Sequence, residues 1–282
     1  MKVRIGVHYD LRRAAREEPD LAALVEHAAA VEAAGGDVVW VAERPTEPDA
    51  WVAAAMPVCA ALAVGTERVR LGTAVLPLLL HHPLRVAEDA ATLDALSGGR
   101  FELGVGLGGD RAALSGFGIA GGERGGRLDE ALELVRAAWR GPLEFEGRYF
   151  QVEGIEVVPR PVQPGGPPVW VGAGAPAAQR RAARLGAGLV LTAGSSPAPY
   201  LEAWSDAGRD RSAARLAALL PGAALREPVA AVEKWLAELP AAAEVAQVDA
   251  VLCVRDPGTD LEEVLTAVVA LNDAHEIRRD RI

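Results

Sequence analysis

Cysteine and lysine are nearly absent from this chain of 282 residues. Its two cysteines, Cys59 and Cys253, lie far apart, so the sequence excludes a disulfide framework and a cysteine-based zinc site. Lys2 and Lys234 are the only lysines among 29 basic residues. We attribute this bias toward arginine, together with the abundant alanine, to GC-rich coding rather than to function. With so little cysteine, we expect a protein of the reducing cytoplasm.

Long apolar runs and excess positive charge are missing as well. Arg, Glu, Pro or Gly interrupts every apolar stretch before it reaches the roughly 18 residues that a membrane helix needs. The chain enters a strand-like run directly after Met1, with no signal-like segment in front. Its 39 acidic residues outnumber the 29 basic ones, which argues against a nucleic-acid partner. We therefore expect a soluble protein that acts on a small molecule, without a membrane or nucleic-acid partner.

Short strand-like runs alternate with helix-like runs along the whole chain. The expected strands are 3–9, 37–42, 68–75, 101–105, 169–172, 188–191, 214–220 and 248–254. The expected helices are 21–34, an alanine-rich segment that ends at 64, 83–96, 127–139, 177–185, 199–207, 229–239 and 261–274. The run 214–220 also suits a helix, because short apolar segments do not separate the two by periodicity.

This alternation predicts an α/β fold, a (β/α)8 TIM barrel. The strands are continuous apolar runs, which is typical of a parallel sheet covered by helices. A closed barrel is favoured over an open sheet because no glycine-rich dinucleotide fingerprint follows the first strand. The runs 143–145 and 149–152 predict a small hairpin inserted after the fourth helix. We interpret residues 1–282 as a single domain whose apolar helix faces would permit a homodimer.

In such a barrel the active site lies at the C-terminal ends of the strands. Most of these ends carry small residues, so we expect a roomy, mostly neutral mouth that suits a flat cofactor. The candidate cofactor-binding residues at these ends are Thr73, Ala74, Val75, Gly106, Gly108, Gly172, Ala173, Gly174, Ala175 and Thr192. The five histidines show no metal-ligand spacing, so we expect no metal.

His8 and Glu43, which follow the first and second strands, are the candidate catalytic residues. His8 could donate a hydrogen bond to a cofactor ring or a substrate oxygen, or be bonded within its own loop. Glu43 could act as acid, base or acceptor if it is desolvated; an ion pair with Arg44 or a neighbouring loop is the alternative. For His81 and His82 we expect a capping or packing role.

The loop after the fifth strand is a candidate phosphate site. Small residues leave backbone N–H groups accessible there, and Pro176 marks the first turn of a helix whose dipole favours an anion. Ala177 and Ala178 belong to this turn, and Arg127 is a further candidate for the phosphate. Packing in an ordinary strand–helix turn and surface ion pairing are the structural alternatives.

Several stretches closely resemble the bacterial luciferase-like superfamily. They are 36–43, 68–77, 82–89 and 92–106, followed by Phe117, Gly118, Arg127, Glu130, 168–172 and 182–186 in the family's order and spacing. The resemblance is strong over residues 1–195 and weak beyond. It implies a barrel that uses reduced FMN or the deazaflavin coenzyme F420, and a non-proline cis peptide bond near Ala74–Val75.

The same resemblance implies where the cofactor binds. The ring would lie over Thr73–Val75 with Glu43 beside it, and the phosphate would bind at 174–178 and Arg127. Luciferases proper place a carboxylate and hydroxyls in the loop after the fifth strand, where this chain has Gly174, Ala175 and Ala178. They also carry an arginine after the fourth strand, where this chain has Leu107. These departures favour F420 over FMN.

The resemblance leads to three hypotheses. The first is hydride transfer between F420 and a small organic substrate, with His8 or Glu43 handling the accompanying proton. The second is a reduced-FMN-dependent monooxygenase with a dry pocket. The third is a non-catalytic cofactor-binding protein, which the neutral strand ends would also suit. The sequence names neither the substrate nor the direction of the reaction.

Overall fold

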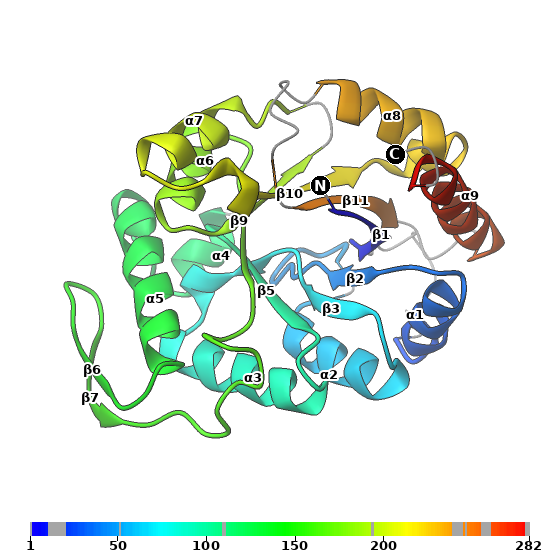
Figure 1. Ribbon diagram of the computed structural model, residues 1–282. Coiled ribbons are helices and arrows are strands. Elements are labelled where there is room, and N and C mark those ends of the chain that lie inside the picture. The colour runs from blue at the N-terminus through cyan, green and yellow to red at the C-terminus, as the bar shows by residue number, and fades with distance from the viewer. Residues whose placement is uncertain are drawn as a thin grey trace.

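A closed barrel of parallel strands forms the centre of the computed structural model (Figure 1). The structure describes residues 2–10, 21–50, 52–108, 111–192, 195–238, 245, 247–254 and 261–279. The barrel strands are β1 (Lys2–Tyr9), β2 (Val38–Val41), β3 (Arg70–Thr73), β5 (Phe101–Gly106), β8 (Val169–Gly172), β9 (Gly188–Thr192), β10 (Arg215–Leu220) and β11 (Gln247–Val254). They pair in the order β3-β2-β1-β11-β10-β9-β8-β5, and a β3–β5 pairing closes the ring. The predicted TIM barrel is confirmed.

Helices between the strands cover the outside of the barrel (Figure 1). They are α1 (Ala23–Ala33), α2 (Ala55–Gly65), α3 (Pro83–Leu96), α4 (Arg111–Gly116), α5 (Arg124–Ala138), α6 (Pro176–Arg184), α7 (Ala198–Asp206), α8 (Pro228–Glu238) and α9 (Leu261–Arg279). Proline opens α3 and α6, where its missing N–H would be unpaired in any case. The main hydrophobic core lies between these helices and the outward-facing side chains of the strands.

Side chains that point into the barrel fill its middle and its N-terminal end. Trp40 and Trp170 meet at 5.3 Å in an edge-on arrangement, together with small apolar residues. Below them Arg4 bonds Glu102 at 2.8 Å and Asp249 at 2.9 Å, and all three are almost fully buried. This end of the barrel is therefore closed, which leaves the opposite end for a site.

The structure departs from the sequence prediction in two places. The expected strand 68–75 is shorter, since β3 ends at Thr73; the short β4 (Leu76–Pro77) follows the Ala74–Val75 peptide bond, which is cis as the resemblance implied. The helix expected to begin at Arg127 begins at Arg124, and the short α4 precedes it. The predicted hairpin is present as β6 (Leu143–Glu146) and β7 (Gln151–Ile155), which projects away from the barrel (Figure 1).

Candidate functional site

A cavity of about 620 Å³ opens at the C-terminal ends of the strands. Nine of the predicted site residues line it: His8, Glu43, Ala74, Val75, Gly106, Gly108, Gly172, Ala173 and Gly174. Thr73, Arg127, Ala175, Ala177 and Ala178 are not among its lining residues. Thr192 ends β9, but its side chain lies outside the described part of the structure. The sequence therefore located the cavity and most of its floor.

Val75 and two glycines form the floor of the cavity. A β-carbon at Gly106 would lie 2.8 Å from Cγ2 of Val75, and one at Gly172 would lie 2.9 Å from Cγ1. These distances are too short for a side chain, so the glycines at the ends of β5 and β8 make room for Val75. At Gly174 an added β-carbon would meet nothing within 4 Å. The floor is thus tightly packed, while the loop after β8 is open.

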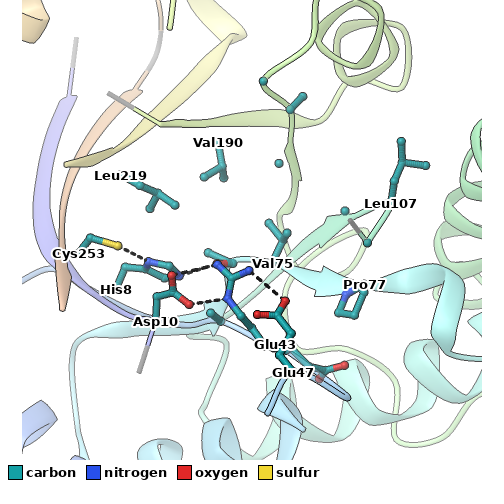
Figure 2. Close-up of a pocket in the computed structure, with 18 of the residues that line it drawn as sticks. His8, Asp10, Glu43, Glu47, Val75, Pro77, Leu107, Val190, Leu219 and Cys253 are labelled. Carbon is teal, nitrogen blue, oxygen red and sulfur yellow. Dashed lines mark hydrogen bonds and ion pairs between the residues drawn. The ribbon is translucent and has the colours of Figure 1, made fainter. Parts of the chain in front are cut away.

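His8 lies deep in the cavity wall and is bonded through both ring nitrogens (Figure 2). Its Nε2 lies 2.6 Å from the carbonyl oxygen of Ala74, and its Nδ1 lies 3.0 Å from Sγ of Cys253. Because a carbonyl oxygen can only accept, Nε2 carries the proton of this bond. His8 thereby fixes the Ala74 carbonyl at the end of β3, which neither sequence alternative for His8 described.

Glu43 is bonded at both carboxylate oxygens. Its Oε1 lies 2.6 Å from Nε2 of His81, and its Oε2 accepts the backbone N–H of Ala55 at 2.8 Å. Ala55 is the first residue of α2, whose N-cap residue Ala54 offers no side-chain cap, so the Glu43 carboxylate caps the buried N-terminus of that helix. The alternative of a pair with a neighbouring loop describes this contact, and the partner is His81.

The two adjacent histidines have different roles. His82 accepts the backbone N–H of Leu84 at 3.3 Å and so caps α3, as predicted. His81 contacts the candidate catalytic carboxylate instead, which the capping or packing prediction missed. The available signal was its position: the segment after β3 and Glu43 after β2 lie at the same end of the barrel.

A second charged group on the cavity wall joins the first two strand ends. Arg44 donates to Asp10 through Nε at 2.6 Å and through a second nitrogen at 2.9 Å, and its Nη1 lies 3.6 Å from Oε1 of Glu47. Burial alone would lower the pKa of Arg44, but the Asp10 carboxylate more than offsets this and the pKa is raised. Arg44 is therefore a fixed cation with two acidic neighbours. The sequence analysis considered Arg44 as an ion-pair partner of Glu43, whereas the carboxylates paired with it here are Asp10 and Glu47.

The loop between β8 and α6 presents backbone amides beside the cavity. No hydrogen bond is seen for the N–H groups of Gly174, Ala175 or Ala177 within the described residues. Gln179, which is almost fully buried in the first turn of α6, donates to the Ser196 carbonyl at 3.1 Å. Its Oε1 atom is buried and finds no partner among the described residues. The arrangement can accept an anion at the amides and a hydroxyl or water at Gln179.

Two predicted cofactor residues have other contacts. The Thr73 hydroxyl is buried, donates to the Gly104 carbonyl at 2.6 Å and accepts the Gly104 N–H at 3.1 Å, so it joins β3 to β5 beneath the floor. The Arg127 guanidinium lies 4.9 Å from the centre of the Phe150 ring and 5.8 Å from that of Tyr149. Both rings belong to the inserted hairpin segment, so Arg127 braces this segment against α5.

The closed ring of parallel strands, with its cavity at the C-terminal strand ends, places the chain in the class of TIM barrels. Over residues 1–280 the chain matches the family described as luciferase-like monooxygenase, and it belongs to this family. Among the helices of the described residues, none combines the length and apolar character that crossing a membrane would require.

Two relatives share a name. An F420-dependent glucose-6-phosphate dehydrogenase of Nakamurella multipartita is 34% identical over 206 residues, which is 70% of this chain and 60% of the relative. An enzyme of the same name from Amycolatopsis mediterranei is 35% identical over 193 residues, covering 64% of this chain and 56% of the relative. The match thus spans about 60% of the length of these curated relatives.

Solved structures share the fold over the whole barrel. An F420-dependent secondary alcohol dehydrogenase in complex with an F420–acetone adduct superposes with a TM-score of 0.78 at 18% identity, covering 95% of this chain and 98% of that one. A monooxygenase from Streptomyces bottropensis gives a TM-score of 0.77 at 21% identity and covers 99% of both chains. At these identities the likeness shows the fold alone.

Proposed function

We propose that this chain is an oxidoreductase that transfers a hydride between F420 and a small organic substrate. The observation that carries the proposal is the cavity itself. Its floor of Val75, Gly106 and Gly172 carries no polar side chain, and the adjoining loop at the start of α6 presents amides for which the described residues show no hydrogen bond. The two relatives named F420-dependent dehydrogenases support the choice of cofactor.

The residues present fit a phosphorylated, polyhydroxylated ring system such as F420. The amides of Gly174, Ala175 and Ala177 would hold the phosphate, helped by the dipole of α6. The buried Oε1 atom of Gln179 finds no donor among the described residues, and a hydroxyl group of the side chain of the cofactor would supply one. The space beside Gly174 is open, so no side chain competes for this position.

When bound, F420 supplies a carbon centre that accepts or gives up a hydride. Val75 would support the ring from below, and His8 would hold the Ala74 carbonyl in its place through the 2.6 Å bond. Leu107 and Leu219, which also line the cavity, would exclude water from the reacting atoms. Glu43 would exchange the proton that accompanies the hydride.

The substrate class follows from the chemistry of hydride transfer. An alcohol, or an electron-poor C=O, C=N or C=C bond, can exchange a hydride with a deazaflavin. Glucose 6-phosphate in the names of the relatives and the secondary alcohol of the structural neighbour both belong to the first group. An alcohol–carbonyl pair is therefore the substrate class that we propose.

A reduced-FMN-dependent monooxygenase is the second candidate. The description of the family and the monooxygenase among the structural neighbours favour it. It would use the same floor and the same amides, so the cavity alone does not separate the two cofactors. A non-catalytic cofactor-binding protein is the third, and it differs from both in giving no turnover.

Titration of the purified protein with F420 and, separately, with FMN tests the proposal. We expect quenching of F420 fluorescence with micromolar affinity and no comparable response to FMN. Tight binding of FMN without binding of F420 would replace the proposal with the monooxygenase. Binding of F420 without oxidation of any alcohol or reduction of any carbonyl compound would leave the non-catalytic reading.

A further inference from the structure

We infer that Cys253 and His8 form a nucleophilic site on the cavity wall, where small α,β-unsaturated carbonyl compounds become covalently attached to the Cys253 sulfur. The inference goes beyond the proposed function, because the reaction needs no F420. It assigns a role to Cys253, which takes no part in the proposed hydride transfer.

The strand pattern directs both side chains into the barrel. Cys253 lies two residues after Val251 on β11, and His8 pairs with Trp40 across β1 and β2. Val251 and Trp40 both belong to the cluster in the barrel interior. Because side chains alternate along a strand and paired residues share a face, Cys253 and His8 point into the same interior. Both residues line the cavity, and Figure 2 shows the sulfur directed at the imidazole.

The His8 ring presents an unprotonated nitrogen to the thiol. Its Nε2 donates to the Ala74 carbonyl at 2.6 Å, so the neutral ring carries its lone pair at Nδ1. The Sγ–H of Cys253 can donate to this atom, which lies 3.0 Å away. A nucleophile, a base within hydrogen-bond reach and a third group that orients the base are thus in place.

The addition to an electron-poor C=C bond balances without a further reactant. Nδ1 of His8 takes the thiol proton, and the sulfur forms a bond to the β-carbon of the ligand. The π electron pair of the C=C bond moves to the α-carbon, which receives the proton from Nδ1. The product is a thioether, and His8 returns to its initial form. The Ala74 carbonyl accepts from Nε2 throughout, so the ring keeps its orientation.

Other charged groups border the same cavity. The Asp10 carboxylate follows β1 and is paired with Arg44, which also lies 3.6 Å from Glu47. Glu43 follows β2 and is bonded to the Ala55 N–H and to His81. Each of these charges has a partner of its own, which leaves His8 as the base that we assign to the thiol.

Cys59 provides a control within the same chain. It lies on α2 and is fully buried, whereas Cys253 is 6% exposed and lines the cavity. Burial raises the pKa of the Cys59 thiol far above its ordinary range. Because the thiolate is the reactive form, Cys59 should stay unmodified while Cys253 reacts. Neither cysteine is in a disulfide bond.

Labelling of the folded, cofactor-free protein with acrylamide at pH 7 tests the site. Intact mass and peptide mapping should give one adduct, at Cys253, with Cys59 reacting at least about tenfold more slowly. Cys253→Ser should abolish the adduct, and the matched control Cys59→Ala should retain it. Mapping of the wild type answers the same question if a variant does not fold. No adduct at Cys253, or equal rates at the two cysteines, would overturn the inference.

His8→Gln tests the base, because the glutamine amide can still donate to the Ala74 carbonyl but does not take up a proton. The thiolate fraction of an unassisted thiol rises about tenfold per pH unit below its pKa, so the labelling rate of H8Q should rise about 100-fold between pH 6 and 8. An imidazole base is already mostly neutral at pH 7, so the rate of the wild type should rise less than about tenfold. Equal pH profiles would show that His8 is not the base.

F420 titration of the labelled protein tests the position of the adduct. Because the adduct would occupy the cavity proposed for the cofactor, the Kd for F420 should rise about tenfold or more. An unchanged Kd would show that the thiol does not face this cavity and would contradict the site. If the unlabelled protein does not bind F420, the proposed function fails, while the labelling pattern and its pH profile still decide the inference.

Discussion

At the N-terminal end of the barrel the charged groups face one another, whereas at the C-terminal end several of them line an open cavity. Arg4 is bonded to both Glu102 and Asp249, and the Trp170 indole donates to Glu102 at 3.0 Å. At the other end Glu43 and Arg44 also have partners and both residues line the cavity, and the Arg44 side chain is 33% exposed. At the N-terminal end the charged groups bond one another within the protein, whereas at the C-terminal end the cavity leaves room for a ligand beside them.

The pKa of Glu102 is set by its burial and by its charged neighbours at the N-terminal end of the barrel. Burial alone would raise it, but the guanidinium groups of Arg4 and Arg70 outweigh burial and lower the pKa to about 2. Glu102 therefore stays ionised over the physiological pH range, so its charge is available for structure and not for proton exchange. Conversely, Glu43 contacts a histidine, the residue type whose charge changes most readily near neutral pH.

The largest effect is expected from breaking the closed end. Arg4→Met removes the cation that two buried carboxylates share, and the remaining charges should destabilise the fold by about 3–5 kcal/mol. Urea unfolding measures the change. Arg85→Met is the control, since Arg85 is 68% exposed and its pairs on α3 should contribute less than about 1 kcal/mol. Equal effects of the two substitutions would contradict the contrast between buried and exposed charge.

How much of each barrel end can be predicted depends on how far apart in the sequence its contacting residues lie. The alternation of strand-like and helix-like runs predicted the barrel. Because active sites of such barrels lie at the C-terminal strand ends, it also predicted that His8, Glu43 and most of the floor residues line the cavity. The Arg4–Glu102–Asp249 cluster escaped notice because its members are 98 and 245 residues apart. A lone charge within an apolar strand signals burial, but the choice of partner depends on the register of the closed sheet.

Local contacts at the cavity were also beyond the sequence. Adjacent histidines at 81 and 82 look alike in the sequence, and only the path of the chain after β4 turns His81 toward Glu43. The small residues at 106 and 172 were expected to leave a roomy mouth for a flat cofactor, whereas the structure shows that both first accommodate Val75. Side-chain direction at the end of an irregular strand is set by tertiary packing, which periodicity does not encode.

A smaller effect is expected from crowding the open end. In Gly172→Ala the new β-carbon would lie 2.9 Å from Val75, and the displacement should cost about 1–3 kcal/mol and weaken F420 binding. Gly174→Ala is the matched control for stability, because its β-carbon would meet no protein atom within 4 Å; F420 binding is compared with that of the wild type, since Gly174 belongs to the proposed phosphate loop. Thermal unfolding and F420 titration measure the two effects. In the double variant with Val75→Ala the cost should shrink, and a purely additive result would show that Val75 is not the obstacle.

Charge at the start of α6 should affect binding and stability in opposite directions. Ala177→Asp places a carboxylate beside the amides proposed for the phosphate, so the Kd for F420 should rise about tenfold or more. The same carboxylate interacts favourably with the helix dipole, and the melting temperature should stay equal or increase. Ala177→Asn has nearly the same shape without the charge and should bind F420 almost normally. A phosphate bound elsewhere would make the two variants alike.

The smallest effect concerns pH, and it sharpens the contrast between the ends. Burial lowers the pKa of His27 from 6.5 to about 4, and its Nδ1 lies 2.9 Å from the hydroxyl of Tyr9, near the C-terminal end of β1. Between pH 6.5 and 4 the unfolded chain therefore binds more protons at this residue than the folded one, so stability is complete above pH 6.5 and falls as the pH drops toward 4. Because the ring is partly exposed, we expect a loss of about 1 kcal/mol.

His27→Gln should remove this slope from a series of urea unfolding curves, whereas His82→Gln, at an exposed position, should retain it. Glu102, whose pKa is about 2, hardly titrates in this range and should not contribute to the slope. An unchanged slope in the His27 variant would show that another group causes the loss of stability at low pH. It would also leave the N-terminal cluster, whose second carboxylate Asp249 has a pKa raised by burial, as the next place to look.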